Sequence, residues 1–263
     1  RAQAIRVMMA ELSRLASHHL FYGVFGMELG AFTPFFYGFR ERELITDIFE
    51  ETCGTRLTMN YVVPGGVMHD LHPDFKKKVQ QYIDQFKQKI GEYHTLLSDN
   101  TIFQERTIGV GVLTEDDIIS YGCTGPVARA SGVKCDIRKE SPYDGYDQLQ
   151  FDEILRTEGD CFSRYMVRME EMLQSIKILE QVLQNIPDGD YLAKVKQVIK
   201  PPAGEVYQRV ETARGEFGVY LISDGSSVTT VTICNVPTVK LTTNAEIVRA
   251  WLAERPTAAQ ASS

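Results

Sequence analysis

Residues 5–28 have the sequence IRVMMAELSRLASHHLFYGVFGME, and the rest of the fold is expected to form around this stretch. Apolar residues recur in it every three or four positions, the spacing that places side chains on one face of an α-helix. Glu11, Arg14 and His18 share another face, so the sequence predicts a half-exposed helix over this part. After Leu20 the polar face disappears, and the helix is expected to enter the interior of a domain or an interface.

The predicted helix brings one carboxylate, Glu28, into a loop rich in Gly, Pro and Phe that reaches Phe36. Apolar surroundings oppose the ionisation of a carboxyl group, so a carboxylate in such a place needs a partner or a function. We therefore predict that Glu28 is buried. Its role is either an ion pair with an arginine in the core or a part in a functional site.

The composition is that of a globular protein. The chain has 263 residues, 43% of them apolar, which is enough for one large domain or two small ones. A formal net charge of -7 and the lack of a basic patch with interleaved aromatic residues argue against a nucleic-acid partner. No apolar run reaches the roughly 20 residues that span a bilayer. Any membrane association is therefore expected to come through partner proteins.

The cysteine pattern argues against a disulfide framework and against a metal site within the chain. Five cysteines stand far apart without a CxxC pair, at Cys53, Cys123, Cys135, Cys161 and Cys234. Reduced thiols in a cytosol-like compartment suit this pattern, and we predict that the chain binds no metal. Because the sequence opens at Arg1 inside a helical pattern, it is expected to be a fragment or one half of a split subunit.

Periodicity along the chain predicts an α+β fold that is mainly helical. Further helices are expected over residues 39–51, 74–98 and 157–186, a loop over 99–106 and an extended segment over 108–112. After residue 200 the pattern alternates, which predicts a small antiparallel sheet from strands near 205–211, 217–222 and 228–234. The expected division is a helical core domain (1–200), a β subdomain (201–243), and a short helix with a disordered tail (244–263).

Residues 122–146 form the longest region without a regular pattern. This segment collects charged residues that include Arg129, Asp136 and Arg138 among glycines and prolines. Ordered charged loops of this length are often functional or lie at interfaces. We interpret these three residues as structural or interface residues, with a charged surface loop as the plainer alternative.

Many segments, in order, resemble the large catalytic-arm subunit of respiratory complex I, which is the 49 kDa subunit in mitochondria and the D-type subunit in bacteria. They cover residues 1 to about 227, beyond which the sequence diverges from that family. The matching segments include Leu29-Gly-Ala-Phe-Thr-Pro-Phe-Phe36, Arg40-Glu-Arg-Glu43, Pro64-Gly-Gly-Val67, Arg129-Ala-Ser-Gly132, Asp136-Ile-Arg-Lys139, Glu158-Gly-Asp160 and Arg214-Gly-Glu-Phe-Gly-Val-Tyr-Leu221.

The resemblance implies a helical core like that of nickel–iron hydrogenase large subunits, without their metal centre. It also implies that the chain helps to form the quinone-reduction site of a proton-pumping NADH:quinone oxidoreductase. The terminal 4Fe-4S cluster would belong to a neighbouring small subunit, and electrons would come from NADH through other peripheral-arm subunits. Ubiquinone or menaquinone would be the substrate. The chain would be peripheral, held by partner subunits on the cytoplasmic face of the bacterial inner membrane or on the mitochondrial matrix side.

The resemblance also assigns residues to the quinone pocket. Leu20 and Val24 match positions that touch quinone in the family, and Glu28 matches an aspartate that pairs with a histidine near the quinone. Phe36 belongs to the aromatic-rich exit of the helix, which is expected to complete the same wall. The histidine and tyrosine that hold the quinone headgroup in the family belong to a segment upstream of Arg1.

Some positions depart from the family and leave other functions open. Thr58 and Val63 stand where the family has a histidine and an arginine. One alternative is a scaffold fragment of the complex without redox chemistry. Another is the large subunit of a hydrogenase-like membrane complex whose electron donor is not NADH. A hydrogenase in the strict sense would need thiolate ligands in two CxxC motifs, and the sequence has none.

Overall fold

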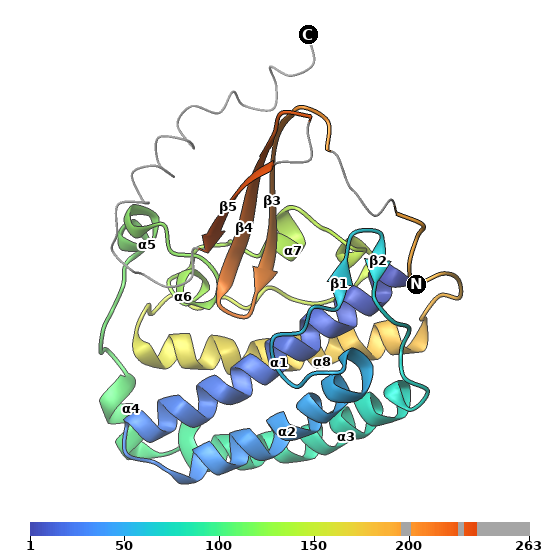
Figure 1. Cartoon of the computed structure of the whole chain (residues 1–263). Coiled ribbons are helices and arrows are strands. Elements are labelled where there is room, and N and C mark those ends of the chain that lie inside the picture. The colour runs from blue at the N-terminus through green and yellow to red at the C-terminus, as the bar shows by residue number, and fades with distance from the viewer. Residues whose placement is uncertain (196–200, 226–228, 236–263) are drawn as a thin grey trace.

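The computed structural model describes residues 1–195, 201–225 and 229–235 (Figure 1). Long helices lie side by side in one part of the molecule, and a narrow antiparallel sheet stands against them. Helix α1 (Ala2–Glu28) packs against both α2 (Thr33–Cys53) and α8 (Cys161–Gln184). The structure therefore confirms the predicted α+β, mainly helical class, with the first helix at its centre.

Helix α1 is buried on more than one side. Its apolar stripe is fully covered, with Ile5, Met8, Leu12 and Leu15 all at 0% exposure. The predicted half-exposed polar face is wrong, because Glu11, Arg14 and His18 are at most 2% exposed and other elements pack over that face too. After Leu20 some residues are buried, such as Tyr22, and others are half-buried, such as Val24. The expected entry into a domain interior or an interface stays a prediction.

Helix α2 begins earlier than predicted, at Thr33, with Pro34 in its first turn, where a missing N–H costs no helical hydrogen bond. It ends at Cys53, two residues later than predicted, and Gly54 follows as the C-cap with a left-handed φ of 79°. Gly38 lets α2 approach α1 closely. A Cβ atom at this position would lie 2.5 Å from the His19 carbonyl oxygen of α1.

Replacing Gly38 by alanine is therefore expected to lower the free energy of unfolding by about 1–3 kcal/mol, because the two helices must move apart. Urea denaturation followed by circular dichroism measures this. Gly91→Ala is the matched control, since Gly91 is also helical but has no atom within 4 Å of the added Cβ. The control is expected to be neutral or slightly stabilising. Equal stability of both variants would show that the close helix approach is not required.

The middle of the chain contains one confirmed helix and one missed helix. A hairpin of β1 (Val62–Val63) and β2 (Gly66–Val67) leads to α3 (Phe75–Tyr93), which continues as the π-helical turn η1 (His94–Ser98). The predicted loop at 99–106 is wrong, because α4 (Thr101–Thr107) forms there. Asn100 caps it by accepting from the backbone N–H groups of Ile102 and Phe103.

Between α4 and α8 the structure has only short helices. They are α5 (Glu115–Tyr121), α6 (Pro126–Arg129), α7 (Ile137–Glu140) and the 3-10 turn η2 (Tyr146–Gln148). Residues 108–112 are turns rather than an extended segment, and Gly109 and Gly111 have positive φ. Helix α8 begins at Cys161 rather than near Thr157, because Asp160 is the N-cap and accepts from the Ser163 N–H at 2.7 Å.

The predicted sheet is confirmed. Strands β3 (Gly204–Thr212), β4 (Gly215–Ser223) and β5 (Thr229–Asn235) pair antiparallel in that order. The tight end of the β3–β4 hairpin, where Thr212 pairs with Gly215, reaches the helical layer. The predicted helix over 245–254 lies outside the described residues, and the division of domains at residue 200 stays a prediction. In the described ranges no helix has both the length and the hydropathy of a membrane span.

Candidate functional site

The second half of α1 lines a cavity of about 440 Å³, called here the α1 slot. Helix α8 contributes one residue and the β3–β4 turn two residues. The lining residues are Ser17, His18, Leu20, Phe21, Val24, Phe25, Glu28, Arg168, Ala213 and Arg214. Cavities of this size commonly accept small organic ligands.

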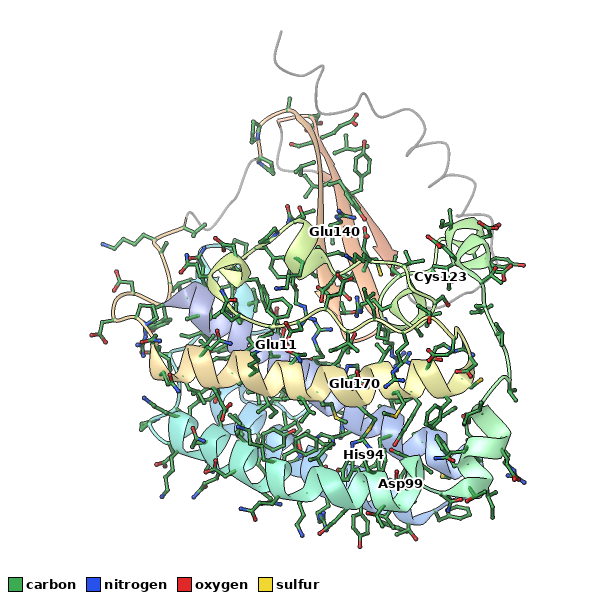
Figure 2. The ribbon with its side chains drawn as sticks, turned by 180° about the vertical axis from the view of Figure 1, so that it is seen from behind. Glu11, His94, Asp99, Cys123, Glu140 and Glu170 are labelled. Carbon is green, nitrogen blue, oxygen red and sulfur yellow. The ribbon has the colours of Figure 1, made fainter. Side chains whose placement is uncertain are left out.

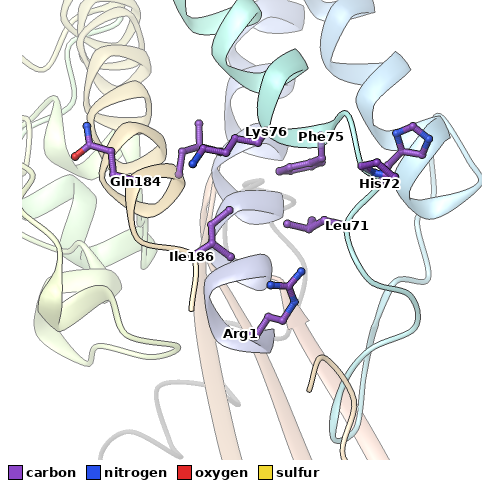
Figure 3. Close-up of a pocket in the computed structure, with 9 residues that line it drawn as sticks. Arg1, Leu71, His72, Phe75, Lys76, Gln184 and Ile186 are labelled. Carbon is purple, nitrogen blue, oxygen red and sulfur yellow. The ribbon is translucent and has the colours of Figure 1, made fainter. Parts of the chain in front are cut away.

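A second cavity, of about 290 Å³, lies at the opposite end of α1 (Figure 3). Arg1, Leu71, Phe75 and Ile186 are among its lining residues, and Figure 3 shows them approaching one another from different segments. None of the residues predicted to bind quinone lies there. The α1 slot is therefore the candidate site that agrees with the sequence analysis.

The structure brings three of the four predicted quinone residues to the slot. Leu20, Val24 and Glu28 recur every fourth position along α1, share one face, and all line the cavity. Burial of Glu28 is nevertheless a wrong prediction, because its side chain is exposed where α1 ends at the edge of the molecule. Phe36 is 68% exposed on α2 and does not line the slot.

Aromatic rings form the apolar wall of the slot. Phe21 and Phe25 are one helical turn apart and stack with their ring centroids 5.2 Å apart. Behind them, Phe25 contacts the ring of Phe103 edge-on at 5.7 Å and that of Tyr165 at 6.2 Å. The wall is thus held by ring packing from α4 and α8, and it offers flat apolar surface to a ligand.

Two arginines, Arg168 and Arg214, bring positive charge to the slot. The guanidinium of Arg168 lies 4.3 Å above the Phe21 ring and donates to the Arg164 carbonyl at 2.7 Å. Burial lowers the pKa of Arg168 to about 10, against the attraction of Glu171. Arg214 of the β3–β4 turn lies at the same cavity and is exposed.

His18 connects the slot to a buried network of charges. Its Nε2 lies 3.1 Å from Oε2 of Glu171, and burial lowers the pKa of the imidazole although Glu171 opposes the shift. Oε1 of Glu171 accepts from Nε of Arg129 at 2.9 Å, and Nη1 of Arg129 donates to Glu211 at 2.9 Å. A chain of ion pairs thus runs from the slot to the base of the sheet.

The network continues to Glu11, which Figure 2 places in the interior of the molecule. Nη1 of Arg138 donates to Oε1 of Glu11 at 3.0 Å, and Nε of Arg14 donates to Oε2 at 3.2 Å. Tyr146 and Ser175 each donate a hydroxyl to this carboxylate at 2.6 Å. Burial alone would raise the pKa of Glu11, but its partners, led by the two arginines, lower it to about 2. The carboxylate is therefore ionised at neutral pH.

The charged residues that the sequence analysis selected from residues 122–146 are buried and do not form a surface loop. Arg129, Asp136 and Arg138 are at most 2% exposed. Arg138 donates two hydrogen bonds to the Asp136 carboxylate, from Nε to Oδ1 at 3.0 Å and from Nη2 to Oδ2 at 2.7 Å. The charges lie inside the chain because their partners on α1 and α8 are buried as well.

Sequence reasoning missed most of this site. Arg168 and Glu171 lie off the apolar stripe of α8, and the sequence alone indicates no particular partner for them. Glu171 binds residues from two other segments, and Arg168 lines the slot. The spacing of residues within one helix does not predict which residues of other segments its side chains contact. Among the described residues, no group of three or more His, Cys, Asp or Glu side chains could hold a metal ion.

Comparison with known proteins identifies relatives over most of the chain. The family described as "Respiratory-chain NADH dehydrogenase, 49 Kd subunit" matches residues 28–201 and 192–248. The C/D subunit of the NADH-quinone oxidoreductase of Bacteroides thetaiotaomicron is 55% identical over 225 residues, which cover 86% of this chain and 42% of that protein. The D-type subunit of the same enzyme from Clostridium beijerinckii is 43% identical over 225 residues, which cover 86% of this chain and 61% of that protein. The chain thus spans less than two thirds of the length of these relatives.

Proposed function

This chain belongs to the family of the 49 kDa subunit of respiratory-chain NADH dehydrogenase, and on that premise we propose that it forms one wall of a quinone-reduction site. The observation that carries the proposal is the α1 slot. Leu20, Val24 and Glu28, which the resemblance assigned to quinone contact, line one cavity together. The names of the bacterial relatives, NADH-quinone oxidoreductase subunits, support quinone as the substrate class.

The chemistry of the slot suits a quinone. A quinone ring is flat and apolar and carries oxygens at opposite ends, and the slot offers apolar side chains between two polar ends. From Leu20 to Glu28 the helix rises about 12 Å. Phe21 and Phe25 give the slot an aromatic wall, and His18, Arg168 and Glu28 bring polar groups to it. In this proposal the chain positions the ring and helps it take up protons.

The remaining parts of the enzyme would come from other chains. Electrons would reach the quinone from a 4Fe-4S cluster in a neighbouring small subunit, after entering from NADH elsewhere in the peripheral arm. The membrane arm would use the energy released to translocate protons. The proposed location is the cytoplasmic face of the bacterial inner membrane, where partner subunits would hold the chain. The bacterial origin of the named relatives supports this location over the mitochondrial one.

Filling the slot tests this proposal. In the assembled complex, Val24→Trp is expected to lower quinone reductase activity more than tenfold, because the indole would occupy the space between the slot walls. NADH oxidation with a water-soluble artificial acceptor should stay unchanged, since it does not need the slot. Steady-state assays with both acceptors on the purified complex measure the two activities.

Val206→Trp is the control, because Val206 lies on β3 and is 53% exposed. It should leave both activities unchanged. Normal quinone reduction by an intact Val24→Trp complex would contradict the proposal. In that case a scaffold without a part in redox chemistry would describe the chain better.

A further inference from the structure

We propose that Arg168 recognises a negatively charged or electron-rich ring oxygen of the ligand in the α1 slot. The inference rests on the proposed function and deepens it, because it assigns one end of the slot to the ligand oxygen that gains charge on reduction. Arg168 would thus be a specificity-determining residue that touches the substrate.

Arg168 lacks the carboxylate partners that the buried Arg129 and Arg138 have. A guanidinium has five N–H donors. In the part of the chain that the structure describes, Arg168 uses Nη1 to bind the Arg164 carbonyl, and no carboxylate oxygen lies within 4.0 Å of it. Arg129 and Arg138, by contrast, each hold carboxylates at 2.7–3.0 Å. A cation that is partly removed from water without a counter-ion attracts an anion.

No carboxylate around the slot forms an ion pair with Arg168 in the described residues, although Glu171 attracts it from a distance. Glu171 is three residues further along α8, but Arg129 occupies its Oε1 and His18 lies 3.1 Å from its Oε2. Glu28 is seven residues beyond Phe21 on α1, which places it about 10 Å further along the helix axis. The slot is therefore positive at its Arg168 end and negative at its Glu28 end.

Several neighbouring charges reinforce this polarity. Burial and the cations Arg164, Arg129 and Arg214 all disfavour the charged form of Arg168 and lower its pKa to about 10, while Glu171 opposes them. The guanidinium is still charged at neutral pH. Burial and the neighbouring cations make this charge unfavourable, and a bound anion would stabilise it. Of the nearby residues, Arg214 and His18 also line the slot.

The position of Arg168 is suited to a flat ligand. The guanidinium lies above the Phe21 ring at 4.3 Å, a cation–π contact that holds it beside this ring. Phe21, Leu20 and Val24 also line the cavity, so a ring lying along this wall would reach the guanidinium with its edge. The ring edge is where a quinone carries its oxygens.

Binding of two quinone analogues to the assembled complex tests this inference. A 2-hydroxynaphthoquinone is ionised at neutral pH, whereas its 2-methoxy counterpart is neutral and of similar shape. The wild-type complex is expected to bind the ionised analogue more tightly. Arg168→Met should weaken binding of the ionised analogue about tenfold, the loss expected for one charged hydrogen bond, and leave the neutral analogue within about twofold. Arg168→Lys should keep part of the preference.

Lys177→Met is the control for net charge, because Lys177 is on α8, half exposed, and does not line the slot. It should change neither affinity. Equal weakening of both analogues by Arg168→Met, or no weakening, would overturn the inference. So would loss of the partner subunits in Arg168→Met with recovery in Arg168→Lys, because Arg168 would then bind a carboxylate of a partner. If the wild-type complex bound neither analogue, the proposed function itself would fail.

Discussion

Replacing Glu11 by alanine is expected to lower the free energy of unfolding by about 3–5 kcal/mol, the typical cost of removing one partner from a buried ion pair. Glu11 is at 0% exposure and accepts hydrogen bonds from Arg14, Arg138, Tyr146 and Ser175. Without the carboxylate, two buried guanidinium groups lose a counter-ion, and two hydroxyl groups lose their acceptor.

Urea denaturation of the purified chain measures this change. Asp152→Ala is the matched control, since its carboxylate is 71% exposed and pairs with Lys177 at 3.3 Å. An exposed pair of this kind contributes at most about 1 kcal/mol. A loss of stability in Glu11→Ala no larger than that of the control would contradict the structural role assigned to Glu11.

The effect of Glu11 should also depend on pH. Its pKa falls from 4.5 to about 2 in the folded chain, so the folded state binds this proton more weakly than the unfolded state. The stabilisation is therefore complete above the ordinary pKa and is lost as the pH falls from about 4.5 to about 2. The difference in stability between the wild type and Glu11→Ala should shrink over that window.

Arg129→Met is expected to have an effect of similar size, about 3–5 kcal/mol. Arg129 is at 0% exposure and neutralises both Glu171 and Glu211, which methionine leaves buried and unpaired. Because the loss comes from the stranded carboxylates, adding Glu171→Gln and Glu211→Gln to Arg129→Met should recover a large part of the stability.

Thermal or urea denaturation of the single and triple variants measures both effects. Arg156→Met is the control, because Arg156 pairs with Glu170 on α8 at a partly exposed position and should cost at most about 1 kcal/mol. If the triple variant were less stable than Arg129→Met alone, the cost would lie in lost packing rather than in unpaired charge.

Local signals in the sequence were enough for the main helices and for the sheet. The apolar spacing in residues 5–28 predicted α1, the periodicity over residues 157–186 predicted α8, and alternation after residue 200 predicted the sheet. Such patterns indicate which face of a helix or strand is buried, because the spacing of its apolar residues can be read within that element alone. Helix α4 was missed although Asn100, its N-cap, is visible in the sequence, because so short a helix shows too few turns for its period to stand out from a loop.

Only the tertiary structure decided which charges are inside. Glu28 looked buried and is exposed, while Glu11 and Arg14 looked half-exposed and are buried. A sequence pattern treats every charged residue as one that is costly to bury. In the fold, the desolvation cost of a buried charge is offset by an oppositely charged partner that can be far away in the sequence, as Arg138 is from Glu11. The sequence by itself determined the long helices, the three-stranded sheet and the family. The slot and its unpaired Arg168 arise only where α1, α8 and the β3–β4 turn meet, because charge compensation depends on distances in space.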